Sequence, residues 1–182
     1  MPTEILTKDG TPIVWADTTD YNPAAGVVFT RTHQIDLTSL ANGAAREGEK
    51  ADLGAARAKT FSVNVGLEID VAPTAGTLID VYWYSSYSAT AGLANSGGAT
   101  GADAAWPADG NEDEWAPQLL YIGSLVCTND AATTVQRACI NPAFSPPTRY
   151  GGVIVDNNCG QAFEGDAVEM YVALVPNPDE SQ

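Results

Sequence analysis

The chain has 182 residues, 45% of them apolar, and carries a formal net charge of −15 at pH 7. A chain of this length fits one domain that buries a sizeable core without any cross-link. Acidic side chains number 23 against 8 Lys and Arg, which excludes nucleic acid and anionic membranes as partners, because both repel a negative surface. Such acidity is typical of solubility at high ionic strength or of docking to a basic surface, and composition leaves both open.

Residues 1–26 are expected to form an extended arm, because Gly10, Pro12, Pro23 and Gly26 interrupt its apolar stretches. The start of the sequence has no basic region followed by an apolar run, and no later segment reaches 18 consecutive apolar residues. We therefore expect neither a signal peptide nor a membrane-spanning helix. An arm of this kind has little to bury by itself, so we expect it to lie on its own domain or to pair with another chain.

The next segment predicts a β-strand over 30–40, where Thr residues partly alternate with apolar ones and where the single histidine, His33, lies. One histidine cannot build a multi-histidine metal site, and no Ser or Cys nucleophile is evident beside it. We interpret His33 as a surface or interface residue. Residues 43–58 hold too few large apolar side chains to anchor a long helix and are expected to be a solvated connection.

The clearest pattern is a strict alternation of apolar and polar residues. Its apolar members are Phe61, Val63, Val65, Leu67, Ile69 and Val71. This pattern predicts a strand over 59–71 with the odd-numbered face on the core. A second strand is predicted over 77–87, and the turn residues 73–76 between them predict a hairpin. The second strand is apolar on both faces, so we expect a sheet on one side and a loop or neighbouring subunit on the other.

Residues 88–116 form a long Ala-, Gly- and Asp-rich loop whose large anchors are Trp106 and Trp115. The two rings are either hydrophobic pins that fasten the loop to the sheet or a platform on which a sugar stacks. The acidic run over 109–114 in the same loop is interpreted as solvated. Binding of Ca²⁺ there is the testable alternative, although the spacing differs from that of a helix-flanked calcium loop.

Further strands are expected over 119–127, 133–140, 152–156 and 167–175. With the earlier segments this gives seven to nine strands, which is enough for two packed sheets. The sequence therefore predicts an all-β fold, with a β-sandwich domain over 27–176 and a flexible tail over 177–182.

Residues suited to chemistry are scarce. The three cysteines, Cys127, Cys139 and Cys159, are odd in number and lack CxxC spacing, so we expect buried thiols, with a Cys127–Cys139 bridge as the alternative. Patterns of the GxSxG, GxGxxG and Walker types are absent. We predict no catalytic residues, no metal site, no cofactor and no enzymatic activity. A glycosidase or depolymerase with two converging carboxylates is the enzyme alternative.

The opening sequence Met-Pro-Thr-Glu-Ile-Leu-Thr-Lys-Asp-Gly-Thr, followed by a Thr-, Ala- and Gly-rich β body, resembles tailed-bacteriophage virion proteins, especially capsid decoration (cement) proteins. The resemblance implies a jelly-roll-like sandwich that forms a homotrimer on the outer capsid surface and ties together subunits of the major capsid protein. It also implies synthesis in the host bacterial cytoplasm. By this analogy, the candidates for contact with the shell or a neighbouring protomer are Ile5, Leu6, Ile13, Val14 and Trp15. Deleting residues 1–15 is then expected to leave a folded body that docks poorly.

The alternative function is a carbohydrate- or receptor-binding head-fibre or tail component with a β-sandwich fold. In that case Trp106 and Trp115 supply the ligand platform. The oligomeric state separates the two functions, because the decoration protein is expected to be a trimer.

Overall fold

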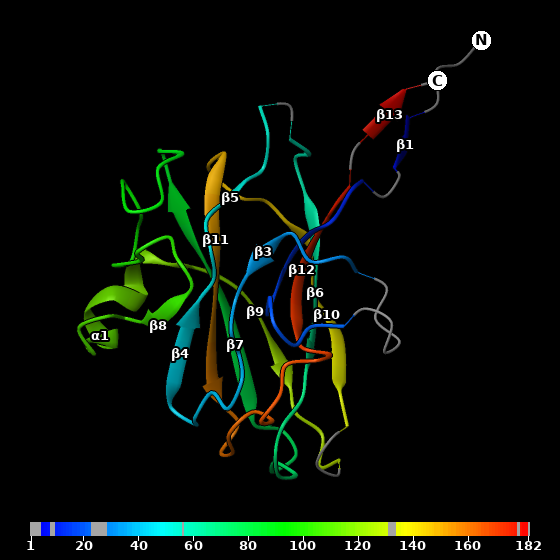
Figure 1. Cartoon of the computed structure of the whole chain (residues 1–182). Helices are drawn as coiled ribbons and strands as arrows, with labels where there is room; N and C mark the ends of the chain where they lie inside the picture. Colours follow the sequence, from blue (N-terminus) through cyan, green and yellow to red (C-terminus); the bar gives the residue numbers. More distant parts are fainter. Residues whose placement is uncertain are drawn as a thin grey trace.

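The computed structural model describes residues 5–7, 10–22, 29–55, 57–130, 134–177 and 179–181, and side chains for all of these except 5–7 and 179–181. The fold is nearly all β, with two sheets of five and six strands packed as a sandwich (Figure 1). The five-stranded sheet has the order β10 (Gln136–Phe144), β6 (Phe61–Leu67), β12 (Tyr171–Pro176), β2 (Ile13–Ala16) and β3 (His33–Gln34). The six-stranded sheet has the order β8 (Ala104–Trp106), β4 (Ala44–Glu47), β11 (Tyr150–Asn158), β7 (Leu78–Ser86) and β9 (Leu120–Val126), and β5 (Ala51–Asp52) pairs with β11.

The core lies between the two sheets and contains the predicted odd-numbered face of β6. Phe61, Val63, Val65 and Leu67 are at most 1% exposed, and they meet Ile79, Val81 and Trp83 of β7 in one apolar cluster. The prediction of an all-β sandwich is confirmed. Val71, which continues the pattern in the sequence, lies beyond the end of β6 and is 51% exposed.

The predicted hairpin of 59–71 with 77–87 is wrong. β6 pairs with β10 and β12, whereas β7 pairs with β11 and β9 in the other sheet. The turn at 73–76 therefore carries the chain from one sheet to the other. A turn signal of this kind fixes where a strand ends and leaves open which strand it pairs with.

The interpretation of residues 43–58 as a solvated connection is also wrong. This segment supplies β4 and β5, which pair with opposite ends of β11. Glu47 and Ala51 are fully buried in them. These strands can consist of small and charged residues because neighbouring loops cover them. They do not need large apolar side chains of their own.

The arm predicted over 1–26 contains a strand of the sandwich. β2 lies between β12 and β3 in the five-stranded sheet, antiparallel to β12 and parallel to β3. Val14 and Trp15 on β2 are 0% exposed. Deletion of residues 1–15 would consequently remove part of the core, in contrast to the expectation from the sequence.

The outer face of β7 is covered by the long loop that follows it, as the two-sided apolar pattern predicted. Tyr84 is 0% exposed and packs in a second cluster with Trp106 and Ile154. The loop contains β8, the short helix α1 (Glu112–Trp115) and a 3₁₀ turn, η2 (Ala116–Gln118). In Figure 1 these elements lie together on the outer side of the six-stranded sheet.

The two ends of the sequence meet in a third, separate piece of sheet. β1 (Ile5–Thr7) pairs antiparallel with β13 (Asp179–Ser181), in the segment predicted as a flexible tail. This terminal ribbon extends beyond one end of the sandwich (Figure 1).

Candidate functional site

The candidate contact residues of the arm fall into two groups. Ile5 and Leu6 belong to β1 of the terminal ribbon, and their side chains are outside the described part of the structure. Ile13, Val14 and Trp15 belong to β2 inside the sandwich. The Trp15 indole donates a hydrogen bond to the Glu49 carbonyl at 2.7 Å, and its ring centroid lies 6.1 Å from that of Trp83. These three residues are therefore part of the protein's own packing.

His33 lies on β3, at the edge of the five-stranded sheet. Its ring is 5.5 Å from that of Trp15, and its Nδ1 is 2.8 Å from the Thr32 hydroxyl. Burial lowers the pKa of the imidazole below its ordinary value of 6.5. The histidine acts here as a packing residue over the Trp15 ring.

Trp106 and Trp115 have the geometry of pins. Trp106 is 4% exposed, and its indole donates to the Gly97 carbonyl at 2.7 Å. The Trp115 indole donates to the Asp109 carboxylate at 3.1 Å, and its ring lies so close to Gly98 that an added Cβ would approach it to 2.9 Å. The rings fasten the loop to itself and to the sheet, and they do not form a shared open platform.

A cluster of carboxyl groups lies on the outer face of the six-stranded sheet. Asp156 of β11 is directly opposite Asp80 of β7, and Glu112 of α1 lies over Asp156. Asp156 is 4% exposed and accepts a hydrogen bond from the Asn158 amide at 2.8 Å. Burial, assisted by the charge of Glu112, raises the pKa of Asp156 to about 6.

The same cluster extends to β9 through hydroxyl groups. The Ser124 hydroxyl donates to Asp80, and the Tyr121 hydroxyl contacts Ser124. Burial and the neighbouring carboxylates raise the pKa of Tyr82 to about 12. Among the described residues, no group of three or more His, Cys, Asp or Glu side chains has the geometry to hold a metal ion. Because its pKa is raised, Asp156 keeps its proton to a higher pH than an exposed carboxyl group does.

Two charged groups, the buried Glu47 and the half-buried Lys50, hold the long loop against β4 and β5. Glu47 accepts hydrogen bonds from the Thr100 backbone N–H at 2.9 Å and from the Thr100 hydroxyl at 2.5 Å, and burial raises the pKa of its carboxyl. The Lys50 ammonium donates to the Ser86 hydroxyl and to three carbonyl oxygens over 88–93, at 2.6 to 3.1 Å. Both groups have structural partners.

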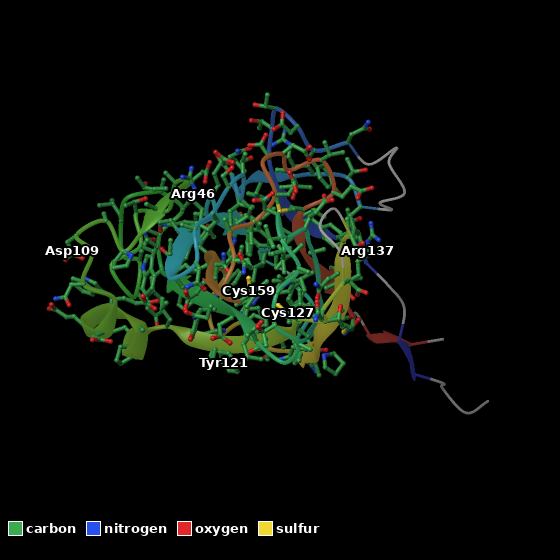
Figure 2. The ribbon with its side chains drawn as sticks, turned by 90° about the horizontal axis from the view of Figure 1, so that it is seen from below. Arg46, Asp109, Tyr121, Cys127, Arg137 and Cys159 are labelled. Atoms are coloured by element: carbon green, nitrogen blue, oxygen red, sulfur yellow. The ribbon has the colours of Figure 1, made fainter. Side chains whose placement is uncertain are left out.

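The cysteines are free, and they divide into a buried pair and an exposed residue. Cys127 and Cys159 lie next to each other in the core, and burial raises the pKa of Cys127 to about 11 (Figure 2). Cys139 is exposed on β10. The expectation of buried thiols is thus correct for two of the three, and no Cys127–Cys139 bridge is present.

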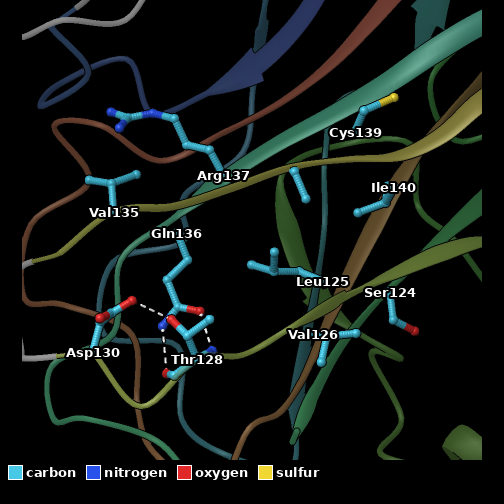
Figure 3. A pocket seen from close by; sticks show the side chains of 11 residues that line it. Ser124, Leu125, Val126, Thr128, Asp130, Val135, Gln136, Arg137, Cys139 and Ile140 are labelled. Carbon is cyan, nitrogen blue, oxygen red and sulfur yellow. Dashed lines mark hydrogen bonds between the residues drawn. The ribbon is translucent and has the colours of Figure 1, made fainter. Parts of the chain in front are cut away.

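A groove runs between β9 and β10, the last strands of their respective sheets (Figure 3). Its volume is about 460 Å³. At one end the Asn141 amide donates to the Ile122 carbonyl at 2.9 Å. At the other end the Gln136 side chain accepts from the Thr128 N–H at 2.8 Å and donates to the Thr128 carbonyl at 3.2 Å. Two amide side chains therefore span the gap between the sheets and leave its middle open.

No family model, curated protein or solved structure matches this chain. Within the described residues, no helix is long and apolar enough to cross a membrane. Functional inference consequently rests on the surfaces themselves, and the terminal ribbon and the β9–β10 groove are two that present strand edges.

The sequence analysis missed the groove and the carboxyl cluster. The sequence holds only part of a signal for the cluster, because Asp80 interrupts the apolar run of β7 whereas Asp156 begins the polar end of β11. A signal for the groove is weaker: Val126, in the segment Leu125-Val126-Cys127, is 59% exposed although the surrounding run is apolar. Such a run predicts burial on both faces, and only the sheet order reveals that β9 is an edge.

Proposed function

We propose that this protein is a non-enzymatic structural protein of a tailed-bacteriophage virion, which binds the lattice of the major capsid protein and stabilises the capsid. In this role it forms a homotrimer on the outer capsid surface after synthesis in the host bacterial cytoplasm, and its sandwich is of the jelly-roll kind. The observation that carries the proposal is the terminal ribbon. Isolated ribbons of two short strands are at best marginally stable in water, so a ribbon that lies beyond its own domain favours a partner.

The charge supports an external position. A net charge of −15 keeps the domain away from packaged nucleic acid and favours a basic or neutral docking surface. The scarcity of convergent chemical groups supports a binding role as well, since the charged groups Glu47 and Lys50 hold the protein's own loop.

Two measurements test the proposal. Light scattering of the purified protein should give about three times the mass of one 19.0 kDa chain. Capsid shells assembled from the major capsid protein of the same genome should co-sediment with the protein, and a version without residues 1–9 should remain in the supernatant. A control is Asp113→Asn, which changes an exposed side chain of α1 on the outer side of the six-stranded sheet. Equal sedimentation of the truncated and full-length chains would contradict docking through the ribbon, and failure of both to bind would contradict the function.

A second candidate function is carbohydrate or receptor binding by a head-fibre or tail component. It is favoured by a groove of about 660 Å³ that is lined by Tyr87, 85% exposed, together with Leu120, Pro147 and Gln118. An exposed aromatic ring suits the apolar face of a pyranose, and an amide side chain suits its hydroxyl groups. A glycan array tests it: binding that is lost in Tyr87→Ala and kept in Trp106→Phe would support this function.

A further inference from the structure

A buried carboxylate just after β6 has no hydrogen-bond donor. In the described part of the chain, the acidic side chains that are at most 7% exposed are Asp17, Glu47, Glu68 and Asp156. The carboxylates of three of them accept hydrogen bonds from backbone or side-chain N–H groups. Among the same described residues, no donor reaches the carboxylate of Glu68, which is 6% exposed. A buried charge without a partner is costly, so this position lacks a group that would stabilise it.

Three more carboxyl groups surround Glu68. They belong to the segment between β11 and β12, which runs beside the end of β6, where the Glu164 N–H donates to the Glu68 carbonyl at 3.0 Å. Burial raises the pKa of the Glu68 carboxyl group above its ordinary value of 4.5, and the charges of Glu169, Asp166 and Glu164 raise it further. Glu164 and Glu169 are half-buried and Asp166 is exposed, so the cluster opens to solvent.

The chain's own cation at this place is already engaged. Arg137 lies on β10 opposite Gly66, two residues before Glu68, and its guanidinium contacts the Tyr171 side chain. Its charge lowers the pKa of Glu68, as the smallest of the contributions. Within the described residues, the ion pairs are Arg46–Asp103 and Arg149–Asp52, so Arg137 forms none with Glu68. Four carboxyl groups therefore face one arginine that has another partner.

A guanidinium group from outside matches this cluster better than a metal ion. In the part of the chain that the structure describes, no three His, Cys, Asp or Glu side chains converge closely enough to hold a metal. An arginine side chain presents five N–H donors in a flat fork, which reaches carboxylates that are spread more widely. It is also more weakly hydrated than an ammonium group, which favours a partly buried position. The net charge of −15 further favours a basic partner.

We propose that the cluster of Glu68, Glu164, Asp166 and Glu169 binds a basic segment of a partner protein, which places an arginine side chain against Glu68. The site lies at the end of the sandwich opposite the terminal ribbon (Figure 1), because Glu68 follows the last residue of β6 whereas the ribbon follows Pro176, which is level with Phe61. The inference therefore goes beyond the proposed function and concerns a different surface from the ribbon.

A synthetic peptide tests the site directly. The probe is a fluorescently labelled peptide in which arginine alternates with glycine, and its control carries citrulline, which has nearly the shape of arginine and no charge. Fluorescence anisotropy at pH 7.5 and about 0.15 M salt measures binding under conditions that screen charges more than about 8 Å away. The wild-type chain should bind the arginine peptide at least about tenfold more tightly than the citrulline peptide.

Substitutions locate the binding. Glu68→Gln keeps the shape of the side chain and should weaken binding of the arginine peptide at least about tenfold, because a charged hydrogen bond is lost. Glu169→Gln, at a half-buried position of the same cluster, should weaken it at least about threefold. The matched control is Asp113→Asn, which removes one exposed negative charge from α1 and should stay within about twofold of wild type. Circular dichroism of all three variants should match wild type.

Several results would overturn the inference. Equal binding of the two peptides, no binding of either, or equal weakening by Glu68→Gln and Asp113→Asn would show that no arginine site exists at Glu68. Stabilisation by millimolar Ca²⁺ that is lost in Glu68→Gln, without any peptide binding, would assign the cluster to a metal ion instead. A version without residues 1–9 should bind the arginine peptide as tightly as the full chain, and loss of binding there would place the contact on the ribbon.

Discussion

Replacing Asp156 by Asn should make the stability of the protein less dependent on pH. The carboxyl group is 4% exposed, and burial with the nearby Glu112 raises its pKa from the ordinary 3.8 to about 6 in the folded protein. Between these two values the folded state binds a proton that the unfolded state releases. The stabilisation is therefore fully present below pH 3.8 and is lost as the pH rises through about 6.

The rise in pKa from 3.8 to about 6 corresponds to roughly 3 kcal/mol of stability lost by wild type at pH 7.5. Asn has nearly the same shape, keeps an oxygen that accepts the hydrogen bond from Asn158, and carries no charge at any of these pH values. The free energy of unfolding of the variant should thus increase relative to that of wild type as the pH rises. Between pH 4.5 and 7.5 the difference in the free energy of unfolding should change by roughly 2 kcal/mol in favour of the variant.

Urea denaturation at four pH values from 4.5 to 7.5 measures this difference. All four pH values lie above the isoelectric point of about 4.1. Urea is preferable to guanidinium because it adds no salt that screens Asp80 and Glu112. Asp113→Asn, on the exposed side of α1, is the control for a general loss of negative charge. A difference in the free energy of unfolding between Asp156→Asn and wild type that stays constant within about 0.5 kcal/mol across this range would refute the raised pKa of Asp156, and so would a control that reproduces the effect.

Three further predictions concern the fold. Val65→Asp should abolish cooperative unfolding in circular dichroism, because it places a charge with no partner at a fully buried position, and a folded variant would contradict the core assignment. Lys50→Met should lower the free energy of unfolding by about 2–3 kcal/mol and speed amide hydrogen exchange over 86–93, because four oxygen acceptors lose their donor. Unchanged exchange would show that Lys50 does not hold this loop. Removing residues 1–9 should leave the melting temperature within about 3 °C of wild type, whereas removing 1–15 should prevent folding, because the longer deletion takes two buried residues of β2; equal behaviour of the two would show that β2 is dispensable.

The fold class could be predicted because alternation is a local signal. In β6 each apolar residue from Phe61 to Leu67 faces the core, as a period of two requires. The pairing of β6 could not be predicted in the same way. Its partners, β10 and β12, follow it by about 70 and 105 residues in the sequence, and nothing in the alternation specifies a distant partner.

The misplaced arm has a different cause. Gly10 and Pro12 indicate an irregular segment, and they do lie just outside β2. The run Ile13-Val14-Trp15 that follows is apolar at successive positions, which is the pattern of a strand covered on both faces. Because this run is only three residues long, the nearby turn residues led to the prediction of an extended arm. The carboxyl cluster was unpredictable for a related reason, since Asp80 and Asp156 become neighbours only through the register of β7 with β11.

The pairing of β1 with β13 brings Ile5–Thr7 and Asp179–Ser181 side by side. The order in which the strands are connected is then close to circular. A short linker that joins the two ends, with new ends cut in the exposed turn between Thr74 and Ala75, would give a circularly permuted chain with the same neighbours around every strand. In such a chain the crossing between the two sheets, rather than the ribbon, would become the place where the polypeptide begins.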